Sequence, residues 1–117
     1  MEEVKHLYRY DYNLTSGFLD LTRVELPCYK FDIIRETPCG YWIVDHEEEG
    51  KFTMGRLMGK EKWVSKTATK RWAHDTEDKA LTNFIYRKKY QLRMLEDQVG
   101  NVKYTLKLAE QLKEKVL

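Results

Sequence analysis

The sequence has few of the features that mark exported or membrane-spanning chains. It contains no run of about 18 apolar residues, so no membrane span is expected. The N-terminus lacks the basic start and the apolar stretch of a secretory signal. Only two cysteines are present, Cys28 and Cys39. A disulfide between them stays open, but without an export signal we expect reduced thiols and a cytoplasmic protein.

Metal-binding and catalytic signatures are also missing. The cysteines lack the companion His and Cys spacing of a zinc site, and the histidines His6, His46 and His74 are isolated in sequence. His46 lies between Asp45 and Glu47, but such a group offers too few fixed ligands, so we expect no metal and no cofactor. No Ser-His-Asp, Cys-His, P-loop or G-x-G-x-x-G pattern occurs. The sequence therefore predicts a protein that is not an enzyme.

The formal net charge of +2 hides an asymmetry between the halves of the 117-residue chain. Residues 1–50 carry eleven acids and five bases, whereas residues 51–117 carry eight acids and sixteen bases. Such a division fits either self-association of oppositely charged faces or an anionic ligand on the second half. Charge alone does not choose between these two interpretations.

Residues 1–75 have the alternation and the turn residues of an antiparallel β-sheet. Residues 4–12 place Tyr8, Tyr10 and Tyr12 on one face of a strand, and residues 28–35 form another. The turn at residues 37–40 connects this strand to one at 41–45, and a further strand is expected at 62–66. Residues 13–17 are expected to form a turn, residues 18–26 an extended segment, and residues 51–59 a loop. We predict a meander of four to six strands.

The pattern of residues 76–117 predicts one long helix. Asp75 or Thr76 is the expected N-cap, and Glu77 and Asp78 suit the positive end of the helix dipole. Apolar residues then recur at alternating steps of three and four, the spacing of a heptad seam, at Leu92, Leu95, Val99, Val102, Leu106 and Ala109. The seam stays in phase across residues 100–101, although Gly-Asn could also end a helix and start a hairpin. The fold class is therefore α+β, and we expect the helix to mediate homo-oligomerisation.

A basic and aromatic stretch is the strongest candidate for a binding site. Between Arg56 and Arg71 there are six bases and one acid, with aromatic and hydroxyl side chains interleaved. Phosphate needs cations and hydroxyl donors, and a base needs an aromatic face. A second basic cluster follows on the helix. The candidate ligand-binding residues are Trp63, Ser65, Lys66, Lys70, Arg71, Trp72, Arg87 and Lys88. The competing interpretation is that the tryptophans are buried against the sheet and the lysines are solvated.

Residues 62–95, which begin KWVSKTATKRW and continue into the expected helix, carry a recognisable pattern. The pattern consists of an aromatic-Val-Ser strand, a Lys-Arg-aromatic-Ala segment and a helix that opens with Thr and acids before Ala-Leu. The turn and strand at residues 35–43 also fit it. This pattern resembles a group of small uncharacterised proteins of tailed bacteriophages. The sequence departs from it at His74-Asp75, where Tyr-Pro is expected, and at Lys79, where an acid is expected. The entry to the helix is therefore the part that the resemblance supports least.

The resemblance implies a phage protein that acts in the cytoplasm of an infected bacterial host. Some similar small oligomeric proteins trap nucleotide messengers, so we expect an anti-defence protein that sequesters an anionic nucleotide-type ligand. Two alternatives remain. In the first, the basic stretch follows a nucleic-acid backbone. In the second, the acidic run Glu47-Glu48-Glu49 contacts a basic host protein.

Overall fold

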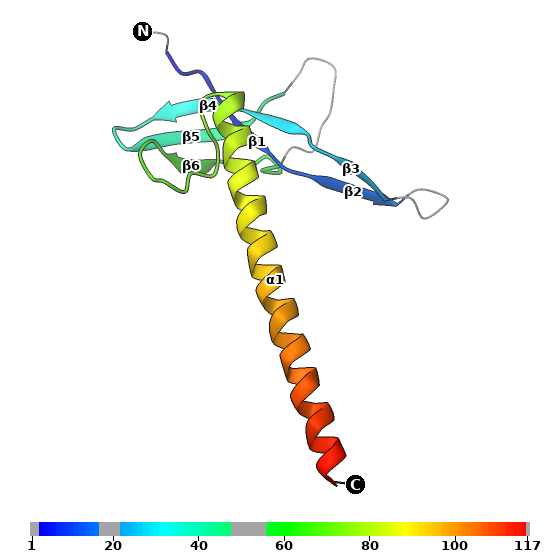
Figure 1. Cartoon of the computed structure of the whole chain (residues 1–117). Helices are drawn as coiled ribbons and strands as arrows, with labels where there is room; N and C mark the ends of the chain where they lie inside the picture. Colours follow the sequence, from blue (N-terminus) through cyan, green and yellow to red (C-terminus); the bar gives the residue numbers. More distant parts are fainter. Residues whose placement is uncertain (1–2, 17–21, 48–55, 117) are drawn as a thin grey trace. The chain divides into compact units, whose positions relative to one another are not determined.

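The computed structural model describes residues 3–16, 22–47 and 56–116. It contains six strands and one helix, in the order β1 (His6–Tyr10), β2 (Asn13–Ser16), β3 (Thr22–Glu25), β4 (Cys28–Glu36), β5 (Gly40–Asp45), β6 (Lys62–Ser65) and α1 (Glu77–Val116) (Figure 1). The fold is α+β, as the sequence predicts. By internal contacts the chain divides into two compact units, residues 1–84 and residues 85–117.

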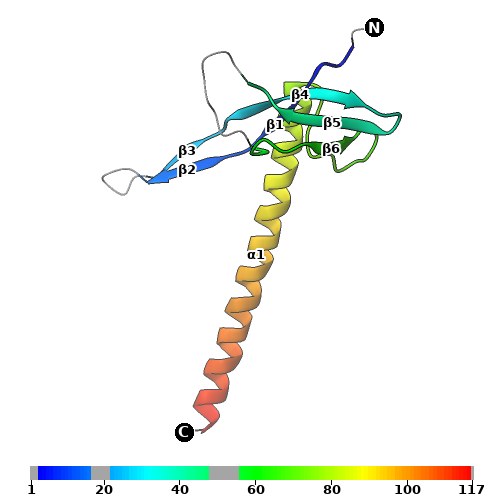
Figure 2. The same cartoon turned by 180° about the vertical axis from the view of Figure 1, so that it is seen from behind.

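Four of the strands form one antiparallel sheet in the order β1-β4-β5-β6. The last three of these strands follow one another along the chain and lie side by side in Figure 2. β4 and β5 meet through the turn at residues 37–40, where Thr37 N–H donates to the Gly40 carbonyl at 2.8 Å. In the pairing of β4 with β5, Phe31 lies opposite Asp45, and an irregularity between Ile33 and Arg35 shifts the register. The predicted strands at 28–35, 41–45 and 62–66 are thereby confirmed.

One face of this sheet carries the core. Leu7, Phe31, Ile43 and Val64 are each at most 3% exposed, and they come from all four strands. Successive side chains of a strand point to opposite faces. The residues directly before and after each of these four in its strand therefore point to the other face of the sheet. The strand predicted over residues 4–12 is confirmed for His6–Tyr10, and Leu7 lies on the covered side.

The segment before the helix packs against the core face. The Trp72 ring lies 5.0 Å from the Phe31 ring, and Ala73 is 1% exposed within the same cluster. Tyr8 and His74 exchange backbone hydrogen bonds of 2.7 and 2.9 Å. The chain therefore passes along the free edge of β1 before the helix begins, and this edge is covered.

Residues 13–16 do not form the predicted turn. They form β2, which pairs antiparallel with β3, with Asn13 opposite Glu25 and Ser16 opposite Thr22. Pairing supplies the backbone with partners along the whole segment, and this outweighs the turn preference of Asn13. The connection between the two strands lies in residues 17–21, outside the described ranges, as do residues 51–55 of the predicted loop and the acids Glu48 and Glu49.

The helix is continuous from Glu77 to Val116, which confirms the predicted single helix and excludes the alternative of a break at residues 100–101. At about 1.5 Å per residue, its 40 residues span about 60 Å. Thr76 is the N-cap, because its Oγ1 accepts the N–H of Lys79 at 3.1 Å. A Cβ atom added at Gly100 would contact nothing within 4 Å. Packing within the chain therefore does not require a glycine at this position.

Most of the helix surface is exposed within this chain. Ala80 and Phe84 are its buried residues, and both belong to the first compact unit. In the second unit the seam residues Leu92, Leu95, Val99 and Val102 are between 48% and 67% exposed. No helix in the described ranges is both long and apolar enough to cross a membrane.

Candidate functional site

The candidate site is a hollow of about 320 Å³ on the core face of the sheet, beside β6. We call it the Lys66 pocket. It brings together three of the predicted residues, Ser65, Lys66 and Arg71, and it adds Tyr41 and Lys79. Its walls are completed by Leu7, Val64, Ala73 and Asp75. All of these residues belong to the first compact unit. Three cations and one carboxylate thus surround one small cavity.

Lys66 is fixed in place by the turn between β4 and β5. Its backbone N–H donates to the Cys39 carbonyl at 2.9 Å, and its ammonium donates to Glu36 Oε1 at 2.6 Å. The hydrogen bond to Glu36 raises the pKa of Lys66 above its ordinary value of 10.5, so the side chain is charged at neutral pH. The ammonium also lies 5.0 Å from the centre of the Tyr41 ring. Lys66 is therefore a fixed cation with an aromatic neighbour.

Arg71 is the least neutralised cation of the Lys66 pocket. One of its guanidinium nitrogens donates to the Lys66 carbonyl at 3.0 Å, which closes the loop between the two residues. Lys66 and Lys79 are paired with carboxylates, whereas none of the carboxylates in the described part of the chain forms an ion pair with Arg71. A guanidinium has five N–H donors in a planar fork, so Arg71 keeps donors for an anion.

Ser65 also lines the Lys66 pocket, and it directly precedes Lys66 at the end of β6. Its Oγ accepts the backbone N–H groups of Thr67 and Ala68 at 3.2 and 3.1 Å. A hydroxyl has one donor and two acceptor positions, so these bonds leave the Ser65 proton for another acceptor. The loop that follows β6 is thus folded back over Ser65.

The two predicted tryptophans lie on opposite faces of the sheet. Trp63 alternates with the buried Val64 and is 42% exposed, on the face away from the Lys66 pocket. Its ring crosses Gly40, where an added Cβ would lie 2.5 Å from ring atoms. Trp72 instead packs on Phe31, with the Arg9 guanidinium 4.6 Å and the Lys62 ammonium 5.1 Å from its ring centre. Neither indole lines the Lys66 pocket, and one ligand cannot contact both.

The remaining predicted residues do not line the Lys66 pocket. Lys70 is exposed in the loop after β6. Arg87 and Lys88 belong to the second compact unit, where the Lys88 ammonium donates to Gln91 at 2.8 Å. The sequence pattern did not identify Tyr41 or Lys79 as residues of the pocket. The pairing of β5 with β6 places Tyr41 opposite Val64, and Lys79 lies in the first turn of α1. Only the pairing of β5 with β6 could have indicated Tyr41.

The prediction that the histidines are isolated is wrong for two of them. The Nδ1 atoms of His6 and His46 lie 2.9 and 2.8 Å from the same oxygen of Asp32, on the sheet face opposite the Lys66 pocket. The pairing of β1 with β4 brings His6 and Asp32 together across 26 residues. The sequence alone carries no signal for such a pairing.

The two cysteines are free and exposed, in agreement with the expectation of reduced thiols. Cys28 begins the nine-residue β4, and Cys39 lies in the turn beyond its other end. Eight steps of about 3.3 Å separate the ends of such a strand by about 26 Å, well beyond the 7 Å limit for a disulfide. An intramolecular bridge is thereby excluded.

Neither a protein family, nor a curated protein, nor a solved structure matches this chain in the three comparisons. The Lys66 pocket combines fixed cations, a hydroxyl donor and a phenol ring, which is a binding arrangement for a small anion.

Proposed function

We propose that this protein binds and sequesters a small anionic ligand of the nucleotide type, without transforming it. The observation that supports the proposal most directly is the convergence of Arg71, Lys66 and Ser65 on one hollow of about 320 Å³. That volume is at the lower end of the roughly 300–1,000 Å³ typical of ligand pockets. It suits a phosphate with one nucleoside better than a long polymer.

Arg71 binds the phosphate in this proposal. Its guanidinium matches two phosphate oxygens at once, and the Ser65 hydroxyl donates to a third. Lys66 and Lys79 lower the electrostatic cost of bringing the anion in, although each already has a carboxylate partner, Glu36 or Asp75. The ring of Tyr41 supplies the aromatic face for the base. Trp72 supports the pocket from the core rather than stacking on the ligand.

The decisive test compares Arg71→Ala with Lys70→Ala by titration calorimetry. The two residues are adjacent and carry the same charge, but only Arg71 lines the Lys66 pocket. The titrants are nucleoside mono- and diphosphates, cyclic mononucleotides and cyclic dinucleotides. We expect one of them to bind the wild type with a fixed stoichiometry. A lost charge-assisted bond costs about 1.5–3 kcal/mol, so Arg71→Ala should weaken this binding about 10- to 150-fold.

Lys70→Ala should change the affinity by no more than about twofold, because an exposed charge contributes little. If Arg71→Ala binds as tightly as the wild type, or if no member of the panel binds, the proposal is wrong. Equal losses in both variants, with an affinity that falls steeply as salt is added, would instead indicate binding along a nucleic-acid backbone.

Self-association through α1 completes the proposal. The seam of the helix remains exposed along residues 92–109, and an exposed apolar row of this length is covered when two such helices pair. A homo-oligomer of this kind carries several copies of the Lys66 pocket. An anti-defence role in the cytoplasm of a phage-infected host is the setting that the resemblance in sequence suggests for such a protein.

A further inference from the structure

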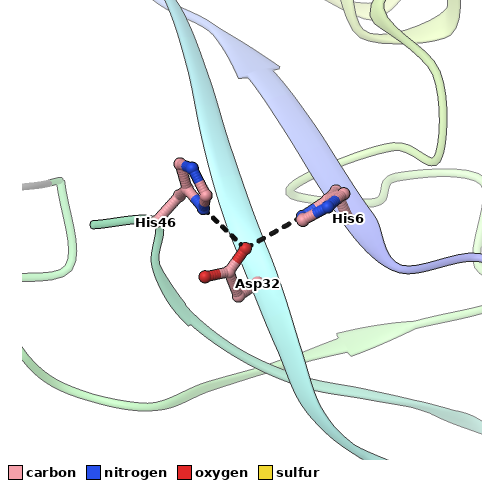
Figure 3. A group of neighbouring side chains, drawn as sticks. All are labelled: His6, Asp32 and His46. Atoms are coloured by element: carbon pink, nitrogen blue, oxygen red, sulfur yellow. Dashed lines mark hydrogen bonds and ion pairs between the residues drawn. The ribbon is translucent and has the colours of Figure 1, made fainter. Parts of the chain in front are cut away.

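We infer that His6, Asp32 and His46 form a binding site for a divalent transition-metal ion on the sheet face opposite the Lys66 pocket. Figure 3 shows both imidazole rings pointing toward one carboxylate oxygen of Asp32. The metal-ligating atoms of the three residues all lie within 4.8 Å of one another. This site is independent of the proposed nucleotide binding, because the two groups of residues point to different faces.

The backbone of the sheet places these side chains together. His6 on β1 is the direct cross-strand partner of Asp32 on β4. Val44 on β5 is the partner of Asp32 on its other side, and His46 follows two residues later. Residues two apart along a strand share a face, so His46 is the diagonal neighbour of Asp32. The His46 N–H also donates to the Lys30 carbonyl at 3.2 Å, which holds it beside β4.

The distances fit ligands that share one ion. His6 Nδ1 and His46 Nδ1 lie 2.9 and 2.8 Å from Asp32 Oδ1, and the two rings meet at 84°. Ligands at about 2.0–2.1 Å from a metal, separated by angles of 90–109°, lie about 2.9–3.4 Å from each other. The two His–Asp distances already lie at the short end of this range, and the ligating atoms of all three residues lie within 4.8 Å of one another. Rotation of the imidazole side chains brings the two histidine nitrogens together around one ion.

The ligand types select the class of metal. Imidazole suits zinc, copper, nickel and iron, whereas magnesium and calcium take oxygen ligands almost exclusively. One carboxylate beside two imidazoles is a donor set of zinc and non-haem iron sites. The side chains of His6, Asp32 and His46 are 32%, 36% and 28% exposed, so an ion reaches them from solvent.

Three protein ligands leave at least one coordination position open. The cluster lines a hollow of about 580 Å³, whose other lining residues include Lys5 and Arg35. Water or an anionic group from solvent completes the coordination there. Binding of the ion also replaces two hydrogen bonds to Asp32 with metal–ligand bonds, and it requires both imidazoles to be deprotonated at Nδ1.

The test is a zinc titration of the untagged protein, followed by competition with a chromogenic chelator. We expect one Zn²⁺ per chain. Asp32→Asn preserves the shape and an acceptor but removes the anionic ligand, and His6→Gln removes an imidazole. Each should weaken zinc binding by at least about 100-fold, more than the 10- to 100-fold typical of a lost second-shell partner. Asp78→Asn, which changes an exposed carboxylate outside the cluster and its hollow, is the matched control and should bind zinc like the wild type.

Substitution of Co²⁺ for Zn²⁺ gives a second readout, because its visible absorption bands report coordination by nitrogen and oxygen. Circular dichroism of each variant without metal shows whether the sheet is intact. If the folded wild type takes up no stoichiometric zinc, or if folded Asp32→Asn binds it as tightly as the wild type, the inference is wrong. The cluster is then a pair of imidazoles that donate hydrogen bonds to one carboxylate.

Discussion

Individual residues set the chemistry of this molecule through their immediate neighbours, and Cys28 is a clear case. Although Cys28 is exposed as a residue, partial burial of its thiol raises its pKa above the ordinary value of 9.0. The hydrogen bond with Tyr10 lowers the pKa, and the Glu77 carboxylate raises it again. The net direction is upward, so the thiol is protonated over a wider pH range than in an unfolded chain.

This leads to a prediction on thiol reactivity. In a Cys39→Ser variant, which leaves Cys28 as the one thiol, the rate of alkylation by iodoacetamide should rise with a midpoint above pH 9.0. The same variant in denaturant supplies the unfolded reference and should react faster at pH 8–9. Tyr10→Phe removes a hydrogen bond that lowers the pKa, so it should move the midpoint further upward. A folded midpoint below that of the denatured chain would contradict this account.

At the residue scale the sequence predicted the candidate site in part. Ser65, Lys66 and Arg71 were found because cations and a hydroxyl recur within seven positions. Tyr41 was not found, since its place in the Lys66 pocket depends on the pairing of β5 with β6. The cluster of His6, Asp32 and His46 depends on two strand pairings. Register is set by contacts far apart in sequence, which local patterns do not encode.

At the scale of elements, α1 is the part that the sequence predicted best. A heptad seam that stays in phase across Gly100 indicates one helix, because two helices joined by a turn have no reason to share a register. The structure confirms the continuous helix. Residues 13–16 show the opposite case, since their turn-forming composition gave no signal of the pairing with β3. Local preference decides only where long-range pairing does not compete.

The exposed seam leads to a prediction on assembly. Val102 is 67% exposed in the single chain and lies on the seam, so Val102→Glu should weaken self-association. Removing one buried aliphatic side chain costs about 1.5–3 kcal/mol in each of two chains. The dissociation constant of a dimer should therefore rise by about 100-fold or more. Analytical ultracentrifugation over a range of concentrations measures this change.

Asn101→Glu is the matched control, because it introduces the same charge one residue earlier and off the seam. It should assemble like the wild type. Equal sedimentation of Val102→Glu and the wild type at all concentrations would show that the seam is not the interface. Circular dichroism at 222 nm confirms that both variants keep the helix.

At the scale of the whole molecule, the proposed ligand binding and the proposed assembly fall in different compact units. Residues 1–84 contain the Lys66 pocket on one face of the sheet and the His6–Asp32–His46 cluster on the other. Residues 85–117 contain the exposed seam. The proposed ligand binding and the proposed assembly therefore depend on separate residues, and we expect that each can be removed by substitution without removing the other.

The central claim is that an assembled form of this protein holds a nucleotide-type anion, and native mass spectrometry tests it most directly. The untagged protein is measured after incubation with the nucleotide panel, first in native buffer and then after denaturation. We expect a dimer or larger species that carries up to one ligand per chain and releases a nucleotide mass on denaturation. A monomer at all concentrations, with no nucleotide mass bound, would contradict both the assembly and the proposed function.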